Sequence, residues 1–178
     1  MSKALDKVWL LFFMWLIAGS TGLYYLKYGK LQLFDPDATL AINSSQIKFD
    51  RKVEDYFKKN FAVTNNAVFH IQSSKCGCNT VTSRHIIELN ELFLKNESVI
   101  QYLSVEDFPD INKLIPSSPS IVIFNSRGEL TYLGPYSAGA FCSTSNSFVT
   151  RFAKKSIEGA FMGAYVIHDA YGCYCLNH

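Results

Sequence analysis

The 178-residue chain has no excess of charge of either sign, since 17 Lys and Arg residues nearly balance 15 Asp and Glu residues. Its basic clusters, such as Lys58-Lys59 and Lys154-Lys155, are short and typical of solvated helix faces, so we expect no nucleic-acid binding. The sequence also lacks internal repeats, low-complexity segments, a Gly-rich phosphate loop and a Ser-His-Asp set that can be placed. These absences argue against repeat proteins, phosphate-loop enzymes and serine hydrolases. The length suits one ordinary domain with a sizeable core.

One long hydrophobic run lies near the N-terminus, in residues 8–26, which carry no charge. As an α-helix these 19 residues would span about 28 Å, close to the thickness of the hydrocarbon core of a bilayer. Trp9 and Tyr24 stand where interfacial aromatic residues are expected. The run continues past the small residues 18–20 without a clear A-x-A site, which favours an uncleaved anchor over a cleaved signal peptide.

Four of the five cysteines form two Cys-x-Cys pairs, Cys76-Gly77-Cys78 and Cys173-Tyr174-Cys175, and Cys142 stands apart. Paired cysteines favour a compartment in which disulfides persist. Lysines flank both ends of the hydrophobic run, so the positive-inside rule does not fix its orientation. We therefore expect a single-pass protein of the inner (plasma) membrane. Residues 8–26 would contact the lipid bilayer, and the soluble domain would lie on the periplasmic or extracytoplasmic side.

Hydrophobic periodicity predicts an α/β domain. Apolar runs at 67–71, 98–103 and 121–124 are typical of buried strands, and a hairpin turn at 125–128 leads into a strand at 129–133. The pattern predicts helices at 50–60, 79–94 and 145–157. This order gives a mixed central sheet flanked by helices, in which helix-linked strands are parallel and the hairpin is antiparallel.

The expected elements divide the chain into four parts. Residues 1–30 form the membrane anchor, and residues 31–49 form a linker. The domain occupies residues 50–160. A C-terminal extension, residues 161–178, contains the second cysteine pair and begins with a segment too apolar for a free tail, so we expect it to pack on the domain.

The first cysteine pair is set where the apolar strand 67–71 runs into the helix 79–94. A helix N-terminus favours a thiolate, so this position suggests redox or metal chemistry. Pro119 then opens the next apolar strand, and Gly134 precedes the last helix. With a cysteine motif after the first central strand, an X-Pro strand start, a Gly turn and a returning strand, residues 50–157 resemble the thioredoxin fold. Together with the anchor, the chain resembles a membrane-tethered bacterial thioredoxin-like protein.

The resemblance implies roles for several residues. It implies that the Ser118–Pro119 peptide bond is cis and faces the sulfurs, with Pro119 as a wall against which a substrate docks. It also implies that His70 takes the place of the family's buried acid beneath the thiols. An imidazole there relays a proton during exchange or is a core histidine. The family has Cys-x-x-Cys, whereas here Asn79 occupies the position of the second cysteine.

For thiol–disulfide exchange, Cys76 is the expected nucleophile and Cys78 its resolving partner. Lys75 adds a positive charge beside Cys76, and Gly77 accepts the backbone angles that a small disulfide ring requires. A disulfide across one residue departs from preferred geometry, so we predict a pair more oxidising than that of a reducing thioredoxin. His85, seven residues after Cys78, is expected at an exposed position.

The second pair, Cys173 and Cys175, allows three interpretations. Its thiols shuttle electrons to or from the first pair, or a structural disulfide pins the extension to the domain. In the third interpretation the four sulfurs converge on Zn²⁺ or Cu(I), with His178 as a further candidate ligand. Cys142 is either a small buried residue or the disulfide partner of a tail cysteine. All five cysteines are therefore disulfide candidates, and both pairs are metal-ligand candidates.

These observations predict a membrane-tethered thiol–disulfide oxidoreductase that acts on protein thiols or disulfides through Cys76 and Cys78, with no cofactor. The alternative is a metal-binding or metal-delivery module that holds Zn²⁺ or Cu(I) with the two Cys-x-Cys pairs. A third possibility is a non-catalytic adaptor that uses the thioredoxin-like fold as a binding platform.

Overall fold

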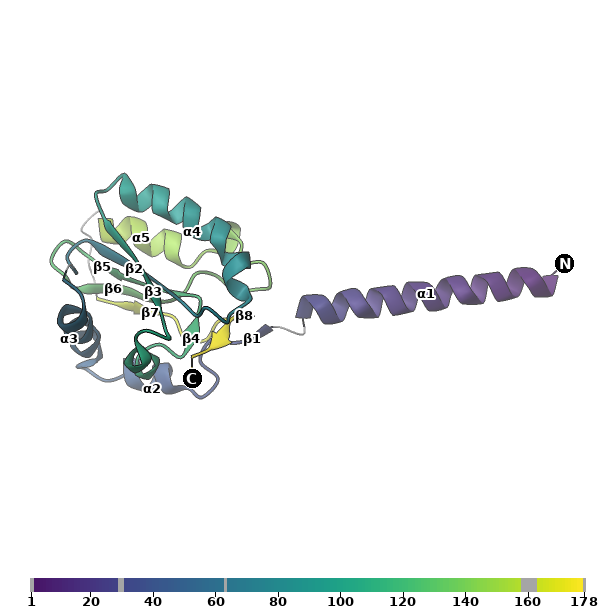
Figure 1. Ribbon diagram of the computed structural model, residues 1–178, viewed down its shortest axis with the longest axis horizontal. Helices are drawn as coiled ribbons and strands as arrows, with labels where there is room; N and C mark the ends of the chain where they lie inside the picture. The colour runs from purple at the N-terminus through teal and green to yellow at the C-terminus, as the bar shows by residue number, and fades with distance from the viewer. Residues whose placement is uncertain (1, 29–30, 63, 158–162, 178) are drawn as a thin grey trace.

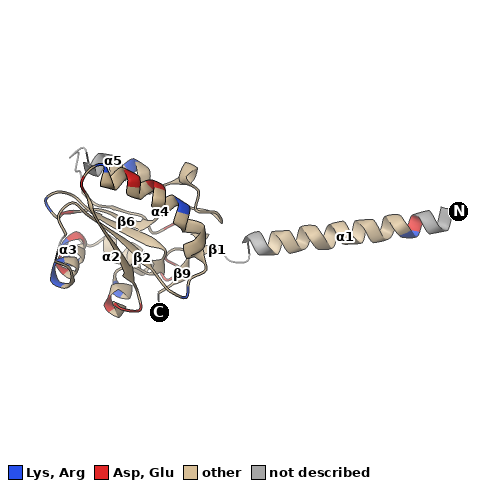
Figure 2. Cartoon of the chain, turned by 45° about the horizontal axis from the view of Figure 1, so that its top comes forward, with Lys and Arg blue, Asp and Glu red and all other residues tan. Residues whose placement is uncertain are grey.

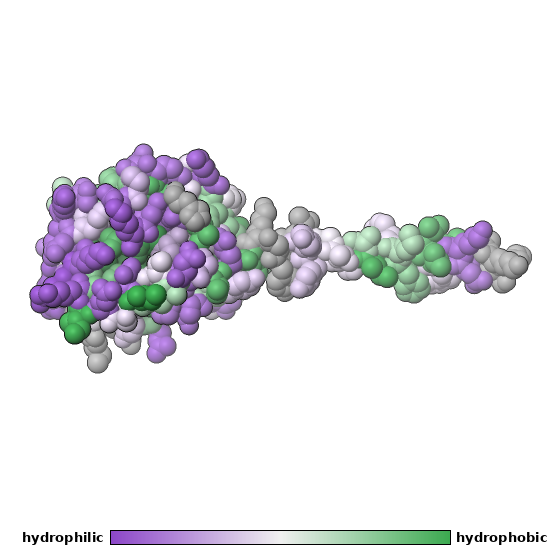
Figure 3. Space-filling view, turned by 90° about the horizontal axis from the view of Figure 1, so that it is seen from below, coloured by the Kyte–Doolittle hydropathy of each residue, from purple (hydrophilic) through white to green (hydrophobic). Residues whose placement is uncertain are grey.

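The N-terminal helix α1 (Ser2–Tyr28) stands away from the rest of the chain in the computed structural model, which describes residues 2–28, 31–62, 64–157 and 163–177 (Figure 1). The large apolar side chains between Val8 and Tyr25 are 43–77% exposed. The colours of Figure 2 mark charged residues on the described part of α1 only near its N-terminal end, and Figure 3 shows the hydrophobic stretch that follows. The segment Asp6–Tyr25 is long and apolar enough to cross a membrane.

A five-stranded mixed sheet forms the centre of the domain, in the order β3-β2-β5-β6-β7. Strand β2 (Ala67–Gln72) pairs parallel with β3 (Val99–Ser104) and antiparallel with β5 (Ser120–Phe124). Strand β6 (Leu130–Pro135) pairs antiparallel with β5 and parallel with β7 (Tyr165–Val166) at the edge. The expected strands, their directions and the hairpin between β5 and β6 are therefore confirmed.

Helices cover both faces of this sheet, because successive side chains of a strand point to opposite sides. Phe69 belongs to the core under α3 (Phe49–Asn60), and Val68 belongs to the core under α4 (Cys78–Leu94) and α5 (Val149–Ile157). Figure 1 shows α4 and α5 on one side of the sheet and α2 and α3 on the other. The expectation of a mixed sheet flanked by helices is confirmed.

The cores on the two faces differ in composition. On the α3 side, the Phe57 ring lies 4.7 Å from the Phe69 ring and 5.2 Å from the Phe124 ring, measured between centroids. Such contacts between large apolar rings contribute beyond the area they bury. On the other side, Tyr132 and Tyr136 are fully buried among aliphatic residues of α4 and α5.

Residues 31–49, which we expected to form a linker, are part of the domain. They contain β1 (Leu31–Leu33) and the short helix α2 (Thr39–Ser44), and Phe34 and Leu40 are buried in the same core as α3. The Asp35 carboxylate accepts hydrogen bonds from the Thr39 hydroxyl and the Ala41 N–H, which holds the start of α2. The expected domain boundary at residue 50 was wrong, because Phe34 and Leu40 pack into the core of the domain.

Two small antiparallel ribbons attach the C-terminal extension to the domain. Strand β1 pairs with β8 (Tyr171–Cys173), and β4 (Ser117–Ser118) pairs with β9 (Cys175–Leu176). The described part of the extension also supplies β7 to the main sheet. At Gly134 the backbone φ is +155°, and a Cβ there would lie 2.8 Å from the Ile167 carbonyl oxygen, so the close approach of the extension requires glycine.

Two single-turn 3₁₀ helices complete the domain, η1 (Pro109–Lys113) and η2 (Thr144–Asn146). The helix expected from residue 145 begins at Val149 instead. The reason is local, since the Ser143 side chain accepts a hydrogen bond from the Ser145 N–H and closes the separate turn η2.

Candidate functional site

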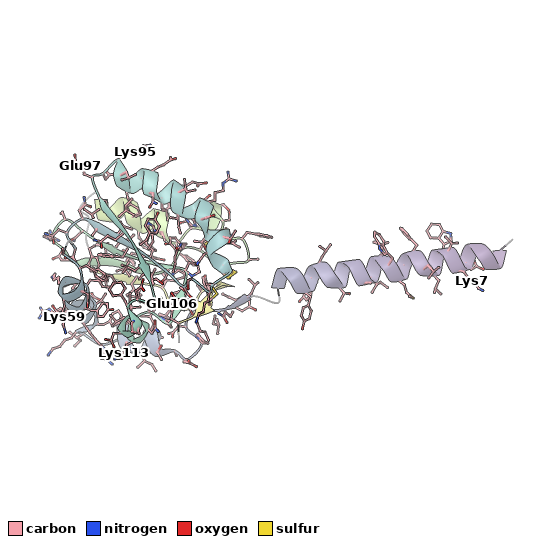
Figure 4. All side chains as sticks on the ribbon, in the orientation of Figure 1. Lys7, Lys59, Lys95, Glu97, Glu106 and Lys113 are labelled. Carbon is pink, nitrogen blue, oxygen red and sulfur yellow. A yellow bond between two sulfur atoms is a disulfide. The ribbon has the colours of Figure 1, made fainter. Side chains whose placement is uncertain are left out.

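Two disulfides join the two Cys-x-Cys pairs. Cys76 is bonded to Cys175 with an S–S distance of 2.04 Å, and Cys78 is bonded to Cys173 with an S–S distance of 2.01 Å. The four residues are called the disulfide cluster below, and Figure 4 shows it at the end of the domain that faces α1. The expected bond between Cys76 and Cys78 is therefore not the one in the structure.

The pairing of the tail with β4 explains this connectivity. In the β4–β9 ribbon Ser118 is opposite Cys175, so the tail runs antiparallel past the residue before Pro119. The Cys76 sulfur lies 3.7 Å from the Ser118 carbonyl oxygen, which puts it beside the same strand. An antiparallel tail places Cys175 next to Cys76 and Cys173 next to Cys78, with Cα–Cα distances of 5.8 and 5.6 Å that suit disulfides.

The peptide bond between Ser118 and Pro119 is cis, as the resemblance implied. Pro119 is buried, and Ser118 contacts the cluster through the carbonyl oxygen described above. In the oxidised protein the tail strand β9 therefore covers the side of β4 on which we expected a substrate to dock.

The first cysteine pair is held by a tight turn before α4. The Ser73 carbonyl oxygen accepts hydrogen bonds from the Cys76 N–H at 3.0 Å and from the Asn79 side chain at 2.6 Å. Gly77 is the N-cap of α4, and Cys78 is its first residue. Both sulfurs of this pair therefore lie at a helix N-terminus, where the dipole stabilises a thiolate once a disulfide opens.

The two pairs differ in exposure. Cys76 and Cys78 are only 5% and 4% exposed, whereas Cys173 and Cys175 are partly exposed. Cys175 lines a cleft of about 480 Å³, together with Lys75, Glu106 and Asn177. Each disulfide thus has one buried sulfur and one sulfur closer to solvent.

Glu106 holds the loop that precedes Cys76. Its carboxylate accepts hydrogen bonds from the Ser73 hydroxyl at 2.7 Å, from the Ser74 N–H and from the Ser104 hydroxyl. The bonds from Ser104 and Ser73 lower the pKa of Glu106 to about 2, so the carboxylate is charged at physiological pH. The cleft consequently carries one negative charge, at Glu106 (labelled in Figure 4), and one positive charge, at Lys75.

His70 is a buried histidine with both ring nitrogens bonded. The Tyr136 hydroxyl donates to Nδ1 at 2.6 Å, and Nε2–H donates to Asn90 Oδ1 at 2.8 Å. The Asn90 amide in turn donates to the Tyr102 hydroxyl. Burial lowers the pKa of His70 from 6.5 to about 4 despite the hydrogen bond to Asn90, so the ring is neutral. These contacts support the core-histidine interpretation rather than the proton relay.

His85 and Cys142 form a second buried pair, contrary to the expected exposure of His85. The His85 Nδ1–H donates to the Cys142 carbonyl oxygen at 3.2 Å, and Nε2 lies 2.9 Å from the Ser147 hydroxyl. Burial lowers the pKa of His85. Cys142 is free and buried, with its sulfur 3.9 Å from His85 Nδ1. Of the two interpretations of Cys142, the small buried residue is therefore the correct one, and Cys142 is not the disulfide partner of a tail cysteine.

The sulfur atoms also meet a geometric condition for a metal site. The sulfurs of Cys76, Cys78 and Cys175 lie within 4.8 Å of one another, and Cys173 is bonded to Cys78. A tetrahedral Zn²⁺ with Zn–S bonds of about 2.3 Å requires sulfurs about 3.8 Å apart. Three cysteine sulfurs therefore lie close enough for a thiolate site in the reduced protein, and Cys173, bonded to Cys78, is the candidate for a fourth ligand. His178, the additional candidate ligand, lies outside the described residues.

Two contributors to the site, Glu106 and Asn177, and the burial of His85 were not found from the sequence. Nothing in the sequence shows that Glu106 reaches the Ser73 turn, because 33 residues separate the two. Asn177 reaches the cleft only through the tail pairing. His85 could have been found, since it follows buried Cys78 and Thr82 on the core-facing side of α4 at helical spacing.

Residues 45–177 match a family described as "Domain of unknown function (DUF6436)". The chain belongs to this family. Comparison with curated proteins gives no match, and comparison with solved structures gives none either. The family match covers both cysteine pairs, so the disulfide cluster lies entirely within the family domain.

Proposed function

We propose that this protein is a membrane-tethered thiol–disulfide exchange protein with a thioredoxin-like fold that acts on protein thiols outside the cytoplasm. The observation that carries the proposal is the Cys76–Cys175 disulfide, which joins a buried sulfur at a helix N-terminus to a partly exposed sulfur in a cleft. The fold is supported by the cysteine motif after β2 and by Pro119 immediately before β5, because pairing of these two strands brings both features to one end of the sheet.

The first step begins at Cys175. A thiolate of the partner protein attacks the Cys175 sulfur from the cleft, and a mixed disulfide forms as the bond to Cys76 breaks. Cys76 leaves with the bonding electron pair as a thiolate. Its place before α4 favours this direction of cleavage, since a leaving thiolate with a lowered pKa departs faster.

The second step uses the other disulfide. The Cys76 thiolate lies within 4.8 Å of the Cys78 sulfur and attacks it, which forms a Cys76–Cys78 bond and releases Cys173 as a thiolate. A second thiolate of the partner then attacks the partner's own sulfur in the mixed disulfide. The partner leaves with a disulfide, and Cys175 becomes a thiolate. The partner dithiol has lost two electrons, and the cluster has gained them.

Exchange can be tested with the oxidised full chain in detergent and a reduced dithiol peptide. We expect one peptide disulfide to form per protein chain. We expect the double variant Cys76→Ser/Cys175→Ser to oxidise the peptide more slowly than the parent protein. The matched control is Cys142→Ser, which removes the free thiol and keeps both disulfides. Oxidation of the peptide at the same rate by the parent and the double variant would refute the proposed route.

A metal site in the reduced protein is the second candidate function, favoured by the mutual distances of the cysteine sulfurs given above. Both Cys-x-Cys pairs would supply thiolates, and such soft ligands suit Zn²⁺ or Cu(I). The bonds of the oxidised cluster would have to be reduced first, so metal binding and disulfide exchange would exclude each other.

Titration of the reduced full chain with Zn²⁺ distinguishes the two candidates. A metal site predicts one Zn²⁺ per chain, bound tightly enough to prevent alkylation of all four cysteines, and loss of this binding in Cys173→Ser/Cys175→Ser. The variant Cys142→Ser should bind normally. Reduced protein that leaves all four thiols open to alkylation in the presence of Zn²⁺ would eliminate the metal function.

A further inference from the structure

The connection between α1 and the disulfide cluster is very short. Helix α1 ends at Tyr28 and β1 begins at Leu31. Because consecutive Cα atoms are about 3.8 Å apart, the Cα atoms of these two residues are at most about 11 Å apart. Leu31 is opposite Cys173 in the β1–β8 ribbon. If α1 spans a bilayer, the cluster is therefore held close to the bilayer surface in any orientation of the domain.

One face of the β1–β8 ribbon is apolar and partly exposed. Residues opposite each other in an antiparallel pair share a face, and alternate residues repeat it. Leu33 is opposite Tyr171, and Leu31 is opposite Cys173, so these four side chains lie on the same face. Leu33 is 46% exposed and Tyr171 is 52% exposed. Gln32 belongs to the other face and donates a hydrogen bond to the Tyr174 carbonyl oxygen, toward the domain.

The loop after β6 adds a third exposed apolar side chain at this end. The Gly139 N–H donates to the Tyr171 carbonyl oxygen at 2.9 Å, and the Gly139 carbonyl oxygen accepts from the Cys173 N–H at 3.2 Å. Phe141, two residues further along, is 70% exposed. Leu33, Phe141 and Tyr171 thus gather around the ribbon that receives the chain from α1. Neither β1 nor β8 contains a charged residue.

From the short connection and this apolar surface, we propose that Leu33, Phe141 and Tyr171 rest in the interface of the phospholipid bilayer that α1 enters. This inference rests on the membrane tether of the proposed function. Aromatic and aliphatic side chains at such positions leave water for the headgroup region, and Tyr is one of the residues enriched there. The consequence for function is that exchange takes place at the membrane surface, with partners whose cysteines are presented there.

Photo-crosslinking of the full chain in vesicles of phosphatidylcholine and phosphatidylglycerol tests this surface. The photoreactive residue p-benzoylphenylalanine replaces Phe141 or Tyr171 in the test variants. It replaces Phe12 in α1 as the positive control and Ile47, which is fully exposed elsewhere on the domain, as the matched negative control. We expect phospholipid adducts at positions 12, 141 and 171 and none at 47. Variants are compared only if mass spectrometry finds both disulfides. If the variant at position 141 or 171 lacks a disulfide, a variant with the photoreactive residue at position 33 takes its place.

Three outcomes would overturn the inference, and they have different meanings. Adducts at position 12 without adducts at 141 and 171 would leave the anchor intact and reject the apolar surface. Crosslinks from 141 or 171 to a second copy of the chain would make the surface a protein interface. Absence of adducts at position 12 would reject the membrane tether and the inference together. The dithiol-peptide assay does not depend on the crosslinking result, so the proposed thiol exchange is tested separately.

Discussion

The two Cys-x-Cys segments have the same spacing but very different surroundings. The first lies in a turn fixed by the Ser73 carbonyl oxygen and enters α4, and both of its sulfurs are buried. The second lies in two short strands that are held by pairing with β1 and β4, and its sulfurs are partly exposed. Equal spacing therefore does not give equal chemistry. In the proposed exchange, Cys175 of the exposed pair would receive the incoming thiol and Cys76 of the buried pair would leave as the stabilised thiolate.

The two segments are also joined by two disulfides. The ribbons that hold the second segment are only two or three residues long, and Tyr174 between its two cysteines packs against Phe34. The covalent bonds to the first segment, which close loops with sequence separations of 99 and 95 residues, complete its attachment. Opening the cluster should thus change the tail far more than it changes α4.

The largest effect is expected when both disulfides are removed. In the chain-entropy picture, the first disulfide across a loop of about 100 residues stabilises the fold by about 5 kcal/mol, and the second closes a much smaller ring worth about 2 kcal/mol. Each pair variant, Cys76→Ser/Cys175→Ser or Cys78→Ser/Cys173→Ser, should lose about 2 kcal/mol in urea unfolding. The fourfold Ser variant should lose about 7 kcal/mol, more than the sum of the two pair variants.

Cys142→Ser is the control for this series, because Cys142 forms no disulfide. A fourfold variant without a cooperative transition counts as a loss larger than the sum. If the fourfold variant lost only the sum of the losses in unfolding free energy of the two pair variants, the two disulfides would act independently. That result would contradict the chain-entropy prediction.

A smaller loss of stability is expected at acidic pH, and it should come from His70 in the strand that leads to the first cysteine segment. Strand β2, which leads to Cys76, carries His70 with its pKa lowered from 6.5 to about 4, whereas burial raises the pKa of Tyr174 in the tail. Below pH 6.5 the unfolded chain binds a proton at His70 that the folded chain does not. The contribution of His70 to the free energy of unfolding is therefore fully present above pH 6.5. It falls between pH 6.5 and 4, by about 3 kcal/mol for a shift of this size.

Urea unfolding at a series of pH values measures this loss. The variant His70→Gln should flatten the profile between pH 6.5 and 4, leaving the smaller contribution of His85, whose pKa is also lowered. The parent protein would contradict the assignment if its stability were the same at pH 6.5 and pH 4.

The smallest effect concerns the two charges at the cleft beside Cys175. Lys75 attracts an anionic thiol and Glu106 repels it, and exposed charges of this kind change rates by a factor of about 2 to 5. The ratio of the rates for mercaptoethanesulfonate and mercaptoethanol should fall in Lys75→Gln and rise in Glu106→Gln. The ratio cancels effects on the loop itself, and high salt should remove both changes. Equal ratios in all three proteins would place the entry of the thiol elsewhere.

Most elements could be predicted because their signals are local. The strand expected at 67–71 is Ala67–Gln72, and the helix expected at 79–94 is Cys78–Leu94. The errors come from residues whose surroundings are distant in the chain. Phe34 and Leu40 were placed in a linker although α3 and the sheet bury them. His85 was placed on the surface although the loop around Cys142 covers it.

The candidate site shows the same division more sharply. Local sequence patterns were enough to predict an apolar segment long enough for a membrane, an α/β order of elements, and two cysteine pairs, one of them at a strand-to-helix junction. Which sulfurs bond to each other depends instead on contacts between distant parts of the chain. A disulfide requires Cα atoms roughly 4.4 to 6.8 Å apart. That distance depends on the register of β9 on β4, which hydrogen bonds between segments far apart in the chain establish.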